Sequence, residues 1–142
     1  MTSVFSSVIC YYELSGQFVV VRNSHNTLDP DGEWSIPTEK IHPSYSAIRS
    51  TAKLVYDELG ADPGRLVFLG YRDVLAAENG QSQHVILDFI TPIIRSQVVN
   101  ANPKKNYDVA WTNLDEIPKP CHDQLSVYLA RYRQRLEASG VR

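Results

Sequence analysis

The sequence predicts an α/β fold, and three observations carry that prediction. Segments 4–12 and 17–22 are rich in β-branched and aromatic residues, as strands are. Segment 46–59 repeats apolar residues at helical spacing, which indicates an amphipathic helix with one core stripe: Ile48, Ala52, Val55 and Leu59. Segment 123–137 does the same, with Leu125, Tyr128, Leu129, Tyr132 and Leu136. At 142 residues the chain suits a single domain, 1–142, with a real core.

The first two predicted strands form a hairpin. Ser15-Gly16 stands between segments 4–12 and 17–22 and is typical of a tight turn. Residues 23–32 contain Asn, Ser, His, Asp, Pro and Gly, which is the composition of a loop.

The helix predicted over 46–59 has a signal at each end. Ser46 suits the N-cap, and Gly60 is the residue expected just past the last turn. A second stripe holds Leu54, Asp57 and Glu58, and Lys53 is spaced for an i, i+4 ion pair with Asp57.

The second half of the chain alternates strand patterns with polar segments. Gly70 marks an expected bulge, and Pro92 is expected to end a strand or to place it at an edge. The predicted order is strand 65–75, turn 76–83, strand 84–94, loop 95–107, strand 108–112, one helical turn over 114–117, and helix 123–137.

Composition excludes several classes of function. A net charge of −2 gives no field that would hold nucleic acid or an anionic membrane non-specifically. No apolar run reaches the roughly 18 residues of a membrane span, and the N-terminus lacks the basic region of a signal peptide. Cys10 and Cys121 have no C-x-x-C spacing, so we expect two free thiols and a cytoplasmic protein.

Residues 33–61, EWSIPTEKIHPSYSAIRSTAKLVYDELGA, resemble the Nudix box, G-x5-E-x7-R-E-U-x-E-E-x-G-U with U aliphatic. Asp57 and Glu58 match its paired acids, and Gly60 matches its last glycine. The box is degenerate at other positions: Thr38 and Glu39 replace the glycines of its loop, Tyr45 its first Glu, Lys53 its Arg, and Leu54 the Glu that follows the Arg.

The resemblance extends to the C-terminal part of the chain. Nucleotide-pool-sanitising Nudix proteins often carry Pro-Glu-Lys, a Trp, Leu-Asp-Glu-Leu-Pro and a helix in this order, matched here by Pro103-Lys104-Lys105, Trp111, Leu114-Asp115-Glu116-Ile117-Pro118 and the helix at 123. Lys53-Leu54, Glu58-Leu59-Gly60 and segment 84–87 also resemble the GDP-mannose mannosyl hydrolase branch. The resemblance implies an α/β/α sandwich around a mixed β-sheet, with one helix on each face.

The resemblance also implies a hydrolase of nucleoside-diphosphate-linked substrates that uses Mg²⁺ (or Mn²⁺). Carboxylates on one helix face hold such an ion against phosphate oxygens. Asp57 and Glu58 are the expected metal ligands, and Lys53, Lys104 and Lys105 are the candidates for phosphate contact.

An alternative is a Nudix-like domain that has lost catalysis and binds a nucleotide, RNA or a protein partner. It is motivated by the replacements at Thr38, Glu39, Tyr45 and Leu54, and by lysines where the family has a later acid. The simpler interpretations of single residues also stay open: Tyr45 as a packing residue, and Lys104-Lys105 as a solvated loop tip. Many relatives dimerise, so a homodimer is possible.

Overall fold

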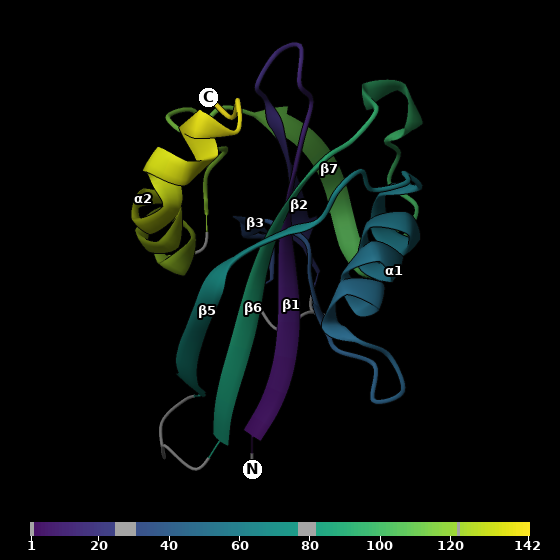
Figure 1. Ribbon diagram of the computed structural model, residues 1–142, viewed down its shortest axis with the longest axis vertical. Coiled ribbons are helices and arrows are strands. Elements are labelled where there is room, and N and C mark those ends of the chain that lie inside the picture. Colours follow the sequence, from purple (N-terminus) through teal and green to yellow (C-terminus); the bar gives the residue numbers. More distant parts are fainter. Residues whose placement is uncertain (1, 25–30, 77–81, 122) are drawn as a thin grey trace.

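The computed structural model describes residues 2–24, 31–76, 82–121 and 123–142, and its strands form one mixed seven-stranded sheet (Figure 1). The strands are β1 (Thr2–Tyr11), β2 (Phe18–Asn23), β3 (Trp34–Ser35), β4 (Thr38–Lys40), β5 (Val67–Ala76), β6 (Ser82–Pro92) and β7 (Asn106–Thr112). The helices of the described residues are α1 (Ala47–Leu59), the short 3-10 turn η1 (Arg95–Gln97) and α2 (Asp123–Ala138).

The strand order is β3-β2-β1-β6-β5, with β4 paired to β1 and β7 paired to β2. β1 and β6 are parallel, and the other pairs are antiparallel. The predicted hairpin is present, since Tyr11 pairs with Phe18 and the Tyr12 N–H donates to the Gln17 carbonyl at 2.9 Å. Beyond that pair the two strands diverge, because β1 continues along β6 while β2 continues along β7.

Alternating side chains of the central strands divide the core into two layers. Val8 and Cys10 of β1 pack in the cluster that contains Leu54, Val55 and Leu59 of α1. The intervening residues of the same strand pack with the apolar stripe of α2. The two helices therefore lie on opposite faces of the sheet, which confirms the predicted α/β/α sandwich (Figure 1).

Both predicted caps of α1 are present. The Ser46 hydroxyl accepts the Arg49 N–H at 3.1 Å, and Gly60 has a left-handed φ of 68° while its N–H donates to the Tyr56 carbonyl. The predicted core stripe is wrong at its first position, because Ile48 is 57% exposed. Packing selects the neighbouring stripe instead, and the buried residues of α1 are Ser50, Thr51, Leu54, Val55, Glu58 and Leu59.

Other local predictions have mixed outcomes. The register between β5 and β6 shifts between Phe68 and Gly70, as the predicted bulge requires, and β6 ends at Pro92. The helical turn predicted over 114–117 is wrong: the chain makes a turn at residues 114–115, with the Glu116 N–H bonded to the Asn113 carbonyl. Parts of the predicted loop 23–32 and turn 76–83 lie outside the described residues. Within the described chain, no helix is long and apolar enough to cross a membrane.

A buried ionic cluster joins the sheet to α2. Asp88 of β6 is 1% exposed and accepts hydrogen bonds from Arg72 at 2.8 and 2.9 Å, from Ser7 at 2.6 Å and from the Tyr132 hydroxyl at 3.0 Å. The Arg72 guanidinium also lies over the Tyr128 ring, 3.7 Å from its centroid. Because the carboxylate has several donors, its burial is compensated, and the cluster is structural.

Candidate functional site

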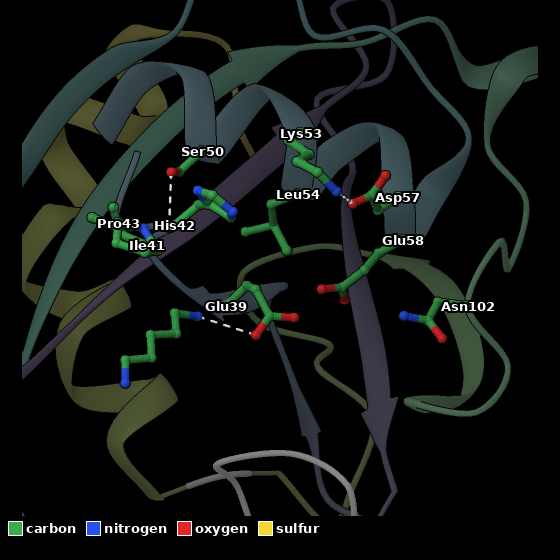
Figure 2. Close-up of a pocket in the computed structure, with 11 residues that line it drawn as sticks. Glu39, Ile41, His42, Pro43, Ser50, Lys53, Leu54, Asp57, Glu58 and Asn102 are labelled. Atoms are coloured by element: carbon green, nitrogen blue, oxygen red, sulfur yellow. Dashed lines mark hydrogen bonds and ion pairs between the residues drawn. The ribbon is translucent and has the colours of Figure 1, made fainter. Parts of the chain in front are cut away.

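A pocket of about 540 Å³ lies between β4, the turn that follows it, and α1 (Figure 2). Its lining contains acidic, basic and apolar side chains: Glu39, Lys40, Ile41, His42, Pro43, Ser50, Lys53, Leu54, Asp57, Glu58 and Asn102. The pocket therefore brings together both acids expected as metal ligands and one of the lysines expected to contact phosphate.

The Lys105 ammonium lies among three oxygen atoms at the inner end of this region. Its Nζ is 2.5 Å from Glu58 Oε2, 2.6 Å from the Thr38 carbonyl oxygen and 3.0 Å from Glu39 Oε2. The second oxygen of Glu58 accepts the Asn106 amide at 2.9 Å. An ammonium has three N–H donors, so Lys105 has a partner for each of them.

The loop before β7 brings Lys105 to this place. The Val99 N–H donates to the Leu59 carbonyl at 2.9 Å, and the Ala101 N–H donates to the Glu58 carbonyl at 3.0 Å. These bonds satisfy carbonyls at the end of α1, which have no partner inside the helix. The loop then turns, with the Lys105 N–H bonded to the Asn102 carbonyl, and enters β7 with Lys105 against the helix.

Glu58 is the most buried charged group of the pocket, at 1% exposure. Burial raises the pKa of its carboxyl above the ordinary value of 4.5, while the charge of Lys105 and the hydrogen bonds from Lys105 and Asn106 act in the opposite direction. A buried carboxylate needs a cation and donors close to it. Lys105 and Asn106 supply both.

Asp57 lies in a different environment from Glu58. Its side chain is 44% exposed and forms the predicted i, i+4 ion pair with Lys53, as Figure 2 shows. The described part of the chain contains no group of three or more His, Cys, Asp or Glu residues that could hold a metal ion. The two adjacent acids of the box therefore differ in burial and in partner.

Leu54 is 3% exposed and packs in the α1 side of the core. Tyr45 stacks on His42, with centroids 4.3 Å apart, and the Arg49 guanidinium lies 4.0 Å from the Tyr45 centroid. The two positions that carry acids in the family pattern are thus occupied by a core residue and by a member of a surface stack.

Sequence reasoning did not find the contact between Lys105 and Glu58, nor the roles of Asn106, Lys40 and Asn102. The one available signal was the pair Lys104-Lys105, which stands where the resembling family has a later acid. Lys104 has an exposed side chain and is not among the residues that line the pocket. Its neighbour Lys105 is the lysine that reaches the carboxylates.

No family model matches the sequence, and no curated protein matches it. Solved structures do. The structure of a MutT Nudix hydrolase from Burkholderia pseudomallei is 18% identical, with a TM-score of 0.79 over 92% of this chain and 97% of that chain. A Nudix hydrolase from Nitrosomonas europaea is 14% identical, with a TM-score of 0.71 over 95% and 90%.

A MutT protein from Methanosarcina mazei is 19% identical, with a TM-score of 0.68 over 96% of this chain and 94% of that chain. These neighbours share the whole architecture with this chain at low sequence identity. The sandwich, the capped helix α1 and the similarity over nearly the full length lead to one conclusion: the chain has the Nudix fold.

Proposed function

We propose that this chain is a Nudix-fold domain that binds a nucleotide-type, phosphate-bearing small molecule in the β4–α1 pocket without metal-dependent hydrolysis. The observation that supports this best is the burial of Leu54 in the core. Leu54 also lines the pocket, but a leucine side chain offers no oxygen to a metal ion, so the stripe of acids that such hydrolysis needs is broken at this position.

The Mg²⁺ that the fold implies does not fit the residues of this site. Glu58 is engaged by Lys105 and Asn106, and Asp57 faces Lys53 at the surface. Mg²⁺ requires near-octahedral oxygen ligands at about 2.0–2.1 Å, and a cationic nitrogen 2.5 Å from the Glu58 oxygen opposes it.

Positive groups on the pocket wall suit a phosphate. Lys53 and Lys40 both line the pocket and are exposed. His42 Nδ1 accepts the Ser44 N–H at 3.1 Å, so the proton of a neutral imidazole is on Nε2, where it can be donated to a phosphate oxygen. Lys105 has no hydrogen bond to offer a phosphate, because its three donors already have acceptors.

Isothermal titration with nucleoside diphosphates, nucleoside diphosphate sugars and dinucleotides tests the proposal. We expect binding of at least one of them that is unchanged by EDTA, and Lys53→Ala to weaken it by about tenfold, as expected for a lost charged contact. Lys119→Ala is the control, since Lys119 is exposed and outside the pocket lining. No binding by any ligand, or binding indifferent to Lys53, contradicts the proposal.

Metal-dependent hydrolysis is the second candidate, and the presence of Asp57 and Glu58 in the same pocket favours it. The same ligands, incubated with Mg²⁺ or Mn²⁺, decide between the two. Turnover that disappears in an Asp57→Asn, Glu58→Gln double variant would establish hydrolysis. Turnover no higher than that of the double variant supports a binding domain. Binding of RNA or of a protein partner, and the predicted homodimer, stay predictions.

A further inference from the structure

We infer that the Lys105 ammonium is a covalently attached replacement for a divalent cation, and that its removal uncovers a cation site formed by Thr38, Glu39 and Glu58. This inference goes beyond the proposed function, because it concerns the cation of the site and holds whichever ligand the pocket binds. It rests on the geometry around Nζ.

Three oxygens from two separate elements converge on Nζ. Two come from adjacent residues of β4, a backbone carbonyl and a carboxylate, and the third comes from the last turn of α1. A mixture of carboxylate and carbonyl oxygens is the donor set of a hard cation. The distances of 2.5 and 2.6 Å lie within the Ca²⁺ range of about 2.3–2.6 Å, the distance of 3.0 Å exceeds it, and all three exceed the Mg²⁺ range of about 2.0–2.1 Å.

The position is fixed and largely closed to solvent. Side-chain exposure is 12% for Lys105 and 2% for Glu58, while Glu39 closes the outer side at 55%. The Lys105 backbone is also held, since its carbonyl accepts the Ser24 N–H at 2.9 Å. The backbone of Lys105 is therefore held in place, and its ammonium is largely enclosed.

A further oxygen lies next to the same carboxylate. Asn106 is fully buried, its Nδ2 donates to Glu58 Oε1, and its Oδ1 has no hydrogen-bond partner among the described atoms. A buried acceptor without a donor is an available ligand for a cation. Two carboxylates and a carbonyl thus surround the point that Lys105 occupies, and Asn106 binds the second oxygen of Glu58.

Lys105 carries one positive charge, whereas the two carboxylates carry two negative charges. The site therefore retains an uncompensated negative charge that a divalent ion would neutralise. Lysine at this position gives a permanent occupant that chelators cannot remove. Wild-type protein is expected to gain no thermal stability from divalent ions.

The experiment is calorimetric titration of purified wild-type protein and Lys105→Ala with Ca²⁺, Mn²⁺ and Mg²⁺ in turn, followed by melting curves with each ion and with EDTA. We expect Lys105→Ala to bind one ion per chain at least about tenfold more tightly than wild type, because a cation in direct contact with the site has been removed. Ca²⁺ is expected to stabilise the variant more than Mg²⁺, given the oxygen spacing.

Lys104→Ala is the matched control, since it removes the same charge from the adjacent exposed side chain and should bind no more metal than wild type. Lys105→Gln serves if Lys105→Ala does not fold without metal, because its amide still donates to Glu58; it should gain affinity in the same direction. Tight one-to-one metal binding by wild type, or no gain in either Lys105 variant, would overturn the inference. Neither outcome bears on nucleotide binding, which is measured separately.

Discussion

Leu54→Glu restores the acid of the family pattern at a position where the structure has a core residue. Leu54 is 3% exposed and packs with Val55 and Leu59 in the α1 cluster. The change removes apolar burial worth about 2 kcal/mol and places a carboxylate among the apolar side chains of this cluster, which adds about 2–3 kcal/mol. We expect the free energy of unfolding to fall by about 4–5 kcal/mol, by the sum of these two terms.

The assay is urea and thermal unfolding followed by circular dichroism. For a chain of this length, each kcal/mol corresponds to about 3 °C, so the melting temperature should fall by about 12–15 °C. Ile48→Glu is the control: it introduces the same charge in the same helix at a residue that is 57% exposed, and it should change stability by less than about 0.5 kcal/mol.

Mn²⁺ provides the result that would refute this reasoning. If position 54 faced a working metal site, the new carboxylate would bind the ion, and saturation at 100 times Kd would return about 2.7 kcal/mol. Recovery of that size in Leu54→Glu, but not in Ile48→Glu, would mean that the position belongs to a metal centre. Loss of stability that is indifferent to metal supports the binding domain.

Three other predictions follow from buried groups. Asp88→Asn should lower the free energy of unfolding in urea by about 3–5 kcal/mol, because it leaves the buried guanidinium of Arg72 uncompensated. The control Asp73→Asn changes an exposed residue and should be nearly neutral. Equal losses in the two variants would contradict the structural role of Asp88. A thiol reagent should label half-buried Cys121 in the native protein and Cys10 only after unfolding. Burial, and to a lesser degree the charge of Glu58, raises the pKa of the Cys10 thiol and so suppresses the reactive thiolate. Rapid labelling of both cysteines in the native protein would contradict this. Burial raises the pKa of Glu58, so the folded chain still holds a proton there at a pH where the unfolded chain has released it, above about pH 4.5. The free energy of unfolding of wild type should therefore fall relative to that of Glu58→Gln as pH rises from 4.5. An increase of wild-type stability relative to Glu58→Gln over the same range would mean that the ion pair with Lys105 outweighs burial.

The sequence predicted those parts of the fold that depend on local interactions. The caps Ser46 and Gly60 act within one turn of α1, so their chemistry is visible in the sequence. The alternation along segments 4–12 and 17–22 and the apolar stripe of 123–137 were likewise sufficient, since each repeats the period of its own element. Two strands, both helices and the bulge at Gly70 follow from such signals.

The tertiary structure alone decided which stripe of α1 faces the sheet. The stripe through Ile48 is the more apolar one by sequence, yet packing against β1 and β2 buries Leu54 and leaves Ile48 exposed. The same selection buries Glu58 and leaves Asp57 in solvent, although they are neighbours in the sequence. Periodicity gives the faces of a helix but not its rotation about its own axis.

The tertiary structure also decides which cation contacts Glu58 in the pocket. Lys105 and Glu58 are 47 residues apart, and no local pattern relates them. They meet because the loop after η1 hydrogen-bonds to the last carbonyls of α1 and then enters β7 beside β2. The sequence placed a lysine where related patterns have an acid; the contact that makes this lysine the cation of the site exists only once the loop has docked on the helix, because hydrogen bonds between distant segments form only in the folded chain.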